Sequence, residues 1–342
     1  MTPQEHLASE LSSCARYELS PAEQKEIEGA GLPAFLKRQL TRKAFRRWKL
    51  PEAAEQRIDT AIAHCIEKNK PITFRYRFGG YKLWRLPSSP EVDWAEFFTF
   101  VHYSRYLAPI AAAHKPGVRM IFASDDVFVE RLDNIGKDKT EAYYRSFQAL
   151  LDEFRKYFPE NFSMDVLKHS SLYEKPEDLE KEFEEKMIQM TNAWEDKPEE
   201  ARQSDLATST LNIRWDGVED LTSLSDEEKQ RKIVTSAIMH DALVALPTIR
   251  SFTADNPGII SVFSFPFPSL IAIGTTKTSI AKFWVGTGVL EQKDGHYYDR
   301  VLTPGQAEQI SEAPHQEIAV DLIPFKNFSS VRIFNGRLDF VK

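Results

Sequence analysis

The sequence has few cysteines and no segment that suits a membrane or a secretory route. Only Cys14 and Cys65 occur, far apart in the chain, so neither a disulfide framework nor a thiolate metal site is expected. No stretch approaches the roughly 18 uninterrupted apolar residues of a membrane-spanning helix. The polar start up to Tyr17 also lacks the apolar core of a signal peptide. We therefore expect a cytoplasmic protein without membrane contact.

Several signatures of function are missing too. The net charge is −7, and no long basic run occurs, which argues against nucleic-acid binding. The eight histidines include no HExxH pair, so no metal is expected, and isolated ones such as His169 and His240 are read as structural. Without a Gly-x-Ser-x-Gly sequence, a hydrolase nucleophile elbow is unsupported. What remains is a 342-residue globular chain with 42% hydrophobic residues and 23 phenylalanines, enough for a large aromatic core or an apolar pocket.

The order of local patterns predicts an α/β fold with a mostly parallel, Rossmann-like sheet flanked by helices. Residues 71–78 alternate apolar and polar side chains, 93–113 suit a helix capped by Asp93, and 118–123 form a short apolar run. This strand–helix–strand order is typical of a parallel sheet. Residues 1–69 are expected to be a helical N-terminal extension and 70–342 the α/β domain. Later apolar runs should add strands to the sheet, with antiparallel ones at an edge.

Polar residues follow the apolar run of 118–123 directly. Ser124, Asp125 and Asp126 would lie at the carboxyl end of a strand, where α/β sheets bind ligands. Two adjacent carboxylates can repel each other and raise one pKa, which suits general acid–base work. They could also hold Mg²⁺ or merely cap the next turn. Adjacent side chains point apart in an extended chain, so both facing one ligand is the less favoured arrangement.

A group of cations surrounds the glycine pair that ends the first strand. Arg75 and Arg77 precede Gly79-Gly80, and Lys82 and Arg85 follow it. Guanidinium and ammonium groups beside flexible backbone can bind a phosphate. The alternative is a set of solvated basic side chains on a loop.

Three further residues are candidates for the same edge of the sheet. Glu96 would lie in the first turn of the helix after the cationic loop, where it could serve the site or only the helix cap. Arg250 could clamp a carboxylate or form an ordinary surface ion pair. Ser264 ends a later strand candidate.

Four segments, in this order, resemble the isonitrile synthase family of pyoverdine and dityrosine biosynthesis proteins. The first is the Pro-x-x-Asp-x-Ala-Glu-like segment at 90–96, and the second runs from Pro116-Gly117 to a counterpart of the family's SDG at 124–126. The third segment leads from Arg250 to residues 264–266, which resemble the family's SIHP. The fourth is 283–286, which resembles PWHG and precedes the turn Asp294-Gly295. The matches span about residues 70 to 300. Asp126 replaces the glycine of SDG, and the histidines of SIHP and PWHG are absent.

The resemblance implies an enzyme that joins the amine of an amino acid, usually tyrosine or tryptophan, to ribulose 5-phosphate and leaves an isonitrile carbon on nitrogen. Relatives in yeast spore-wall synthesis make a formylated tyrosine instead. No cofactor is implied, and the partners would be small molecules, with a homodimer left open.

We assign Asp125 as acid–base and Glu96 as an orienting catalytic residue. Substrate binding falls to Arg75, Lys82, Arg85, Ser124, Asp126, Arg250 and Ser264. A phosphate- or Mg²⁺-dependent transferase and a non-catalytic binding protein are the alternatives.

Overall fold

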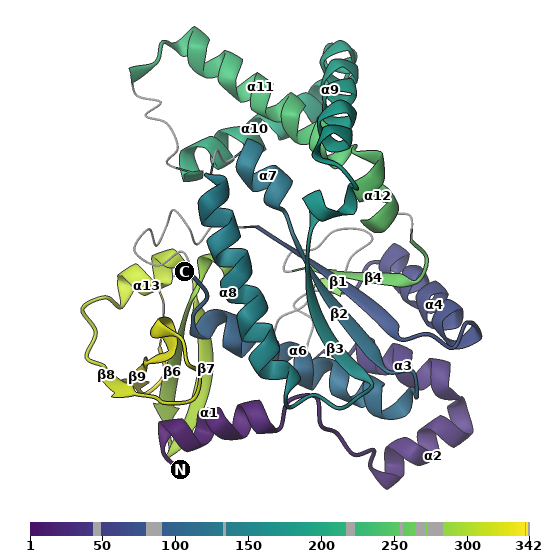
Figure 1. The fold of residues 1–342 in the computed structure, drawn as a ribbon, viewed down its shortest axis with the longest axis vertical. Coiled ribbons are helices and arrows are strands. Elements are labelled where there is room, and N and C mark those ends of the chain that lie inside the picture. The colour runs from purple at the N-terminus through teal and green to yellow at the C-terminus, as the bar shows by residue number, and fades with distance from the viewer. Residues whose placement is uncertain are drawn as a thin grey trace.

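A five-stranded parallel sheet forms the centre of the molecule (Figure 1). The computed structural model describes residues 1–43, 49–79, 91–132, 135–216, 223–253, 256–263, 271–272, 283–338 and 340. The strand order is β3-β2-β1-β4-β5. These strands are β1 (Ile72–Phe78), β2 (Val118–Ser124), β3 (Phe162–Lys168), β4 (Ile259–Phe263) and β5 (Ile271–Ala272). The predicted α/β class and the mostly parallel sheet are confirmed.

Helices precede the sheet, flank it and extend beyond it (Figure 1). The helices before the sheet are α1 (Pro3–Ser12), α2 (Pro21–Ala30), α3 (Leu32–Leu40) and α4 (Glu52–Glu67). Those between the first strands are α6 (Trp94–Ala113), α7 (Asp126–Arg131) and α8 (Lys137–Arg155). The later ones are α9 (Pro176–Ala193), α10 (Glu199–Asp216), α11 (Asp226–Val244), α12 (Pro247–Thr253) and α13 (Pro304–Gln309).

An aromatic core fills the space between the sheet and the helices α6 and α8. Alternate β1 side chains point to one face, and there the Phe78 ring stacks on Phe147 of α8 at 4.9 Å between centroids. Phe122 of β2 packs against Phe100 and Phe147 at 5.2 and 5.3 Å. All four side chains are at most 1% exposed. The abundant phenylalanines therefore form the core that the composition predicted.

The turn before β2 depends on glycine. Gly117 has φ +81°, and a Cβ there would lie 1.7 Å from the carbonyl oxygen of Asn161. Gly117 therefore allows the chain to enter β2 in close contact with the start of β3. The register that follows pairs Phe78 with Ser124 and Ser124 with Lys168, so three strands end side by side.

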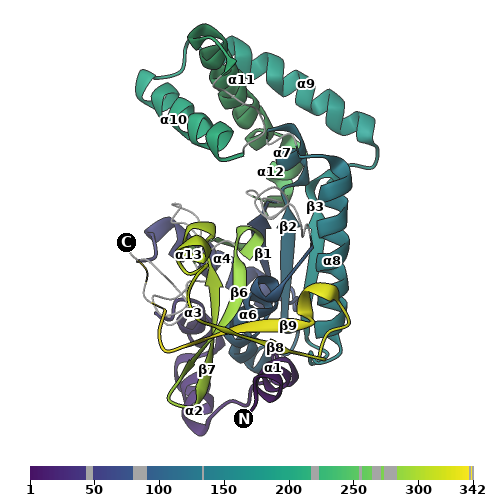
Figure 2. The same ribbon diagram turned by 90° about the vertical axis from the view of Figure 1, so that its left-hand side faces the viewer.

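The helices α9, α10 and α11 form a group that projects past the carboxyl ends of β2 and β3 (Figures 1 and 2). Helix α11 contacts both α9 and α10 and also touches α7. Trp194, Ala237 and Ile238 are the buried residues of its small hydrophobic core. Helix α11 begins directly after Ser225, which caps it, and Glu228 completes a capping box.

Among the later strands, β4 and β5 extend the parallel sheet as the sequence predicted, but the four strands that follow residue 286 do not. They form a second sheet of order β7-β6-β9-β8. Its strands are β6 (Thr287–Lys293), β7 (His296–Leu302), β8 (Gln316–Ala319) and β9 (Ser330–Asn335). Asp294 and Gly295, both at positive φ, make the predicted hairpin turn.

The second sheet packs against the start of α6. A Cβ on Gly288 would lie 2.3 Å from the Trp94 backbone, and the Trp94 indole nitrogen donates to the Ser330 carbonyl at 2.6 Å. Strand β6 therefore packs along α6 and does not pair with the edge of the first sheet.

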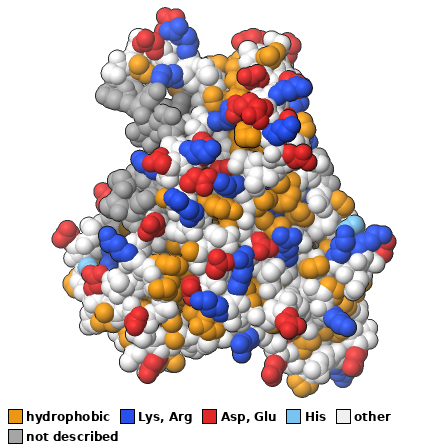
Figure 3. Space-filling model, viewed as in Figure 1, with side chains coloured by type: hydrophobic (Ala, Val, Ile, Leu, Met, Phe, Trp, Pro, Cys, Tyr) orange, Lys and Arg blue, Asp and Glu red, His pale blue; other side chains and the backbone are white. Residues whose placement is uncertain are grey.

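The first helices share the main core with the sheet. Leu7 of α1, Phe35 of α3 and Ile58 of α4 belong to the same buried cluster as Phe74 and Phe122. Whether residues 1–69 form a separate unit stays a prediction. In the part of the chain that the structure describes, no helix combines the length and apolarity needed to cross a membrane. The face seen in Figure 3 mixes acidic, basic and apolar side chains.

Candidate functional site

The candidate site lies where the strand order of the parallel sheet reverses. Strand β1 has β2 on one side and β4 on the other, and ligands of open α/β sheets bind beyond the carboxyl ends of the strands at such a point. The backbone N–H of Asp125 donates to the carbonyl of Phe78 at 2.7 Å. This bond places the residue after β2 directly beside the end of β1.

Asp125 lies between a cation and an imidazole. Its Oδ1 accepts a hydrogen bond from Arg77 Nε at 2.5 Å and lies 3.1 Å from Nδ1 of His169. The Arg77 guanidinium also lies over the Phe128 ring, 4.1 Å from its centroid. Asp125 makes no side-chain cap bond to α7. The carboxylate therefore serves this cluster rather than the helix start.

The charge of this cluster determines the protonation of Asp125. Burial alone would raise the pKa of the Asp125 carboxyl, but the Arg77 charge and the His169 contact outweigh it and leave the pKa below its ordinary value. The prediction that carboxylate repulsion raises a pKa is therefore wrong for Asp125. An ionised Asp125 suits the stabilisation of a protonated imidazole better than proton donation.

Two histidines that were read as structural from the sequence lie at or near this cluster. His169 follows β3, is fully buried, and has no aligned hydrogen-bond partner for either ring nitrogen among the described residues. His240 of α11 lies 6.2 Å from the Phe128 ring, and burial together with the Arg77 charge lowers its pKa. The register of β1, β2 and β3 brings Arg77, Asp125 and His169 together, and no spacing in the sequence reveals it.

Asp126 points to a different partner. Its Oδ1 accepts from the Ser170 backbone N–H at 3.2 Å, and its Oδ2 accepts from the Ser170 hydroxyl. The two adjacent carboxylates therefore do not share one ligand, as extended backbone favours. No cluster of three or more His, Cys, Asp or Glu side chains suited to a metal ion occurs in the described ranges. The separation of the pair counts against Mg²⁺ bound between Asp125 and Asp126.

Glu96 is enclosed beside Tyr143 of α8, whose ring contacts Phe78 at the end of β1. It completes the capping box of α6 by accepting from the Asp93 N–H at 2.8 Å, and it accepts from the Tyr143 hydroxyl at 2.7 Å. The side chain is fully buried. The capping interaction is thus present, and a catalytic role for Glu96 stays a prediction.

The remaining predicted residues divide into three groups. Arg75 lies within β1 and is almost buried, while Ser124 ends β2 in register with Phe78. Arg250 lies on α12, which packs against the turn at His169–Leu172, but its side chain is exposed. Lys82, Arg85 and Ser264 lie outside the described residues.

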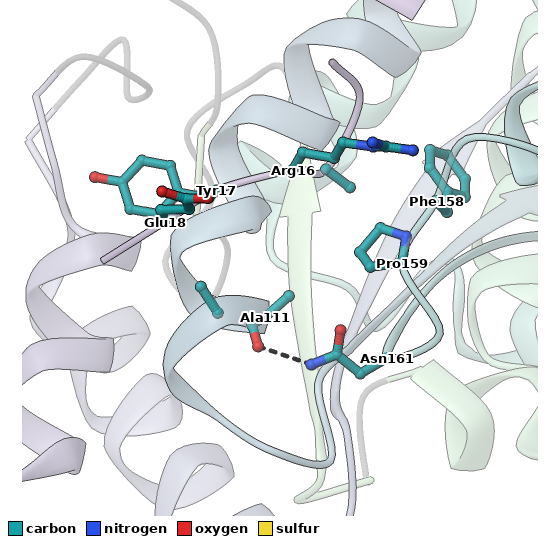
Figure 4. A pocket seen from close by; sticks show the side chains of 9 residues that line it. Arg16, Tyr17, Glu18, Ala111, Phe158, Pro159 and Asn161 are labelled. Atoms are coloured by element: carbon teal, nitrogen blue, oxygen red, sulfur yellow. Dashed lines mark hydrogen bonds between the residues drawn. The ribbon is translucent and has the colours of Figure 1, made fainter. Parts of the chain in front are cut away.

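A separate hollow lies at the other end of the strands from the Asp125 cluster (Figure 4). It has a volume of about 540 Å³ and lies between Arg16–Glu18 and Phe158–Asn161. The Asn161 amide donates to the Ala111 carbonyl at 2.8 Å and closes one side of the hollow. It lies at the amino ends of β2 and β3, away from the Asp125 cluster.

Comparison with known proteins supports the fold. No family model and no curated protein sequence matches the chain. The structure is similar to the crystal structure of the PvcA protein from Pseudomonas aeruginosa, with a TM-score of 0.56 and 16% sequence identity. The match covers 98% of this chain and all of that one. At this identity the likeness establishes a shared architecture along the whole chain.

Proposed function

We propose that this protein is an isonitrile synthase-like enzyme that condenses the amine of an amino acid with the ketone of ribulose 5-phosphate. The observation that carries the proposal is the Arg77–Asp125–His169 cluster at the strand-order reversal. The fold shared with PvcA, along nearly the whole chain, supports it. The four segments that resemble the isonitrile synthase family, and that occur in the family's order along the chain, support it too.

Condensation needs a group that can both take and give a proton. The amine nitrogen attacks the ketone carbon, a proton moves from nitrogen to oxygen, and water leaves as the imine forms. An imidazole is suited to both transfers near neutral pH. We assign the proton transfers to His169, and we assign to Asp125 the stabilisation of its protonated form, as in other carboxylate–histidine pairs.

The remaining substrate contacts follow from the resemblance and the charge pattern. Lys82 and Arg85 are proposed to hold the phosphate, and Arg250 to face the amino acid carboxylate. Ser124 and Ser264 would line the same edge of the sheet. The choice of tyrosine or tryptophan, and of an isonitrile or a formamide as product, rests on the resemblance alone.

Mass spectrometry of the purified protein with ribulose 5-phosphate and a panel of amino acids tests the proposal. We expect a new product with tyrosine or tryptophan. No new mass with any amino acid, combined with no binding of the phosphosugar, would refute it. An activity lost on treatment with EDTA would instead favour the metal-dependent transferase.

A non-catalytic binding protein is the second candidate. It is favoured by Val285, which stands where the family motif PWHG carries histidine. In that case Asp125→Asn leaves ligand affinity intact and no substrate pair gives turnover.

A further inference from the structure

Arg75 is a buried cation at the centre of the parallel sheet. It lies in the middle of β1, in register with Ile121 of β2 and Ser261 of β4, and is 8% exposed. Its Nε has no hydrogen-bond partner among the described residues. Buried arginine is normally paired, because an unpaired buried charge is costly.

The neighbours of Arg75 add positive charge rather than removing it. Arg77 is two residues along the same strand, so the two side chains leave the same face of the sheet. The pKa of Arg75 is lowered to about 9, chiefly by burial and further by the charges of Arg77 and of Arg57 on α4. The charge of Asp125 opposes this change. Asp125, however, already accepts from Arg77 Nε. The carboxylate that acts on Arg75 is therefore engaged by another cation, and Arg57 donates to the Asn256 carbonyl at 3.3 Å.

Another arginine projecting from the same face shows how the sheet pairs a cation when the pair is structural. Arg119 of β2 is in register with Thr73, and therefore faces the same side as Arg75. Its Nε donates to Asp165 at 2.8 Å, and its side chain is 51% exposed. Arg119 is thus solvated and paired, whereas Arg75 is almost buried and its Nε has no partner among the described residues.

We propose that Arg75, with Arg57 and Arg77, forms a subsite for an oxyanion of a small-molecule substrate, either a phosphoryl or a carboxylate group. The guanidinium fork matches both groups through paired N–H donors. The subsite lies beside the Asp125–His169 pair, since Arg77 contacts Asp125 and adjoins Arg75 on one face of β1. The inference rests on the proposed function only in assigning the oxyanion to one of its two substrates.

Calorimetric titration with inorganic phosphate, and separately with tyrosine, tests the subsite without any turnover. We expect the wild-type protein to bind at least one of the two probes and Arg75→Gln to bind it about tenfold or more weakly. Arg119→Gln is the matched control and should bind within about twofold of wild type. The probe that loses affinity in Arg75→Gln identifies the oxyanion as phosphoryl or carboxylate. Equal affinity in Arg75→Gln and wild type, or no binding of either probe to wild type, would overturn the inference.

Thermal melting of Arg75→Met without ligand gives an independent readout. Because the variant removes an unpaired buried charge, it should melt at or above the wild-type temperature, and the bound probe should stabilise only the wild type. A variant that melts well below wild type in probe-free buffer would show that Arg75 is structural and would contradict the subsite. A protein that binds phosphate through Arg75 but forms no condensation product would retain the subsite and lose only the proposed reaction.

Discussion

On one face of β1, Phe78 stacks on Phe147 of α8, and Tyr76 packs against Tyr103 of α6; on the other face the same strand carries Arg75 and Arg77. The aromatic face is closed, and the rings of Tyr76 and Phe78 contact aromatic side chains of α6 and α8. The opposite face holds the nearly buried Arg75, whose Nε has no partner within the described ranges, and the Arg77–Asp125 ion pair, which adjoins His169. The aromatic face holds the fold together, and the charged face carries the residues to which we assign ligand binding and proton transfer.

The largest stability effect should come from the aromatic face. Phe122→Ala leaves a cavity among the rings of Phe100 and Phe147, and we expect a loss of about 3–5 kcal/mol in the free energy of unfolding. Urea denaturation followed by circular dichroism measures it, with Phe122→Leu as the milder control. A loss below about 1 kcal/mol would show that this face is not closely packed.

Removal of Arg77 should have the next largest effect, and a dependence on pH. In Arg77→Met the Asp125 carboxylate keeps its burial but loses the main charge that lowers its pKa. We expect a loss of about 3 kcal/mol at neutral pH. The lowered pKa of wild-type Asp125 gives stability that is present above its ordinary value near 3.8 and is lost as the pH falls through the lowered value.

The stability difference between wild type and Arg77→Met should therefore shrink as the pH falls from the higher Asp125 pKa of the folded variant to the lowered pKa of the folded wild type. Urea unfolding of both proteins over a pH series gives the comparison. A difference that stays constant down to the acid limit would mean that Asp125 is not the group that Arg77 stabilises.

His240 should make a smaller contribution to the pH dependence of stability, and it should do so at a higher pH than Asp125. Its lowered pKa means that the unfolded chain binds a proton more readily, so stability is lost as the pH falls below the ordinary histidine value of 6.5. Replacing it in His240→Phe should flatten the stability curve just below that pH. An unchanged curve would show that α11 does not bury this imidazole against Phe128.

The smallest effect should come from the exposed ion pair on the charged face. Arg119→Gln breaks the contact with Asp165, and we expect a change within about 0.5 kcal/mol because exposed pairs contribute little. A larger loss would place Arg119 in the fold rather than on its surface and would remove it as the control for Arg75.

Local patterns made much of the fold predictable. The capping boxes that begin at Ser20, Asp93 and Ser225 need only residues three apart, and all three occur. The second sheet was not predictable in this way, since β6 pairs in parallel with β9, far along the chain. Strand β8 is short and largely exposed, so it lacks the apolar signal by which strands are recognised.

The site was predictable in position but only partly in composition. The rule for parallel sheets located Asp125 at the carboxyl edge, and Arg75 and Arg77 were visible as cations of β1. His169 was read as structural because its meeting with Asp125, 44 residues away, depends on the register of β2 and β3. Its burial and its unaligned ring nitrogens are properties of the folded chain alone.

Turnover of Asp125→Asn is the decisive measurement of whether the charged face is a reacting centre. We expect the wild-type protein to convert an aromatic amino acid and ribulose 5-phosphate to a new product, and Asp125→Asn to do so about a hundredfold or more slowly. Product formation is followed by mass spectrometry, and a melting curve confirms that the variant is folded. A folded Asp125→Asn protein with the wild-type rate would contradict the account.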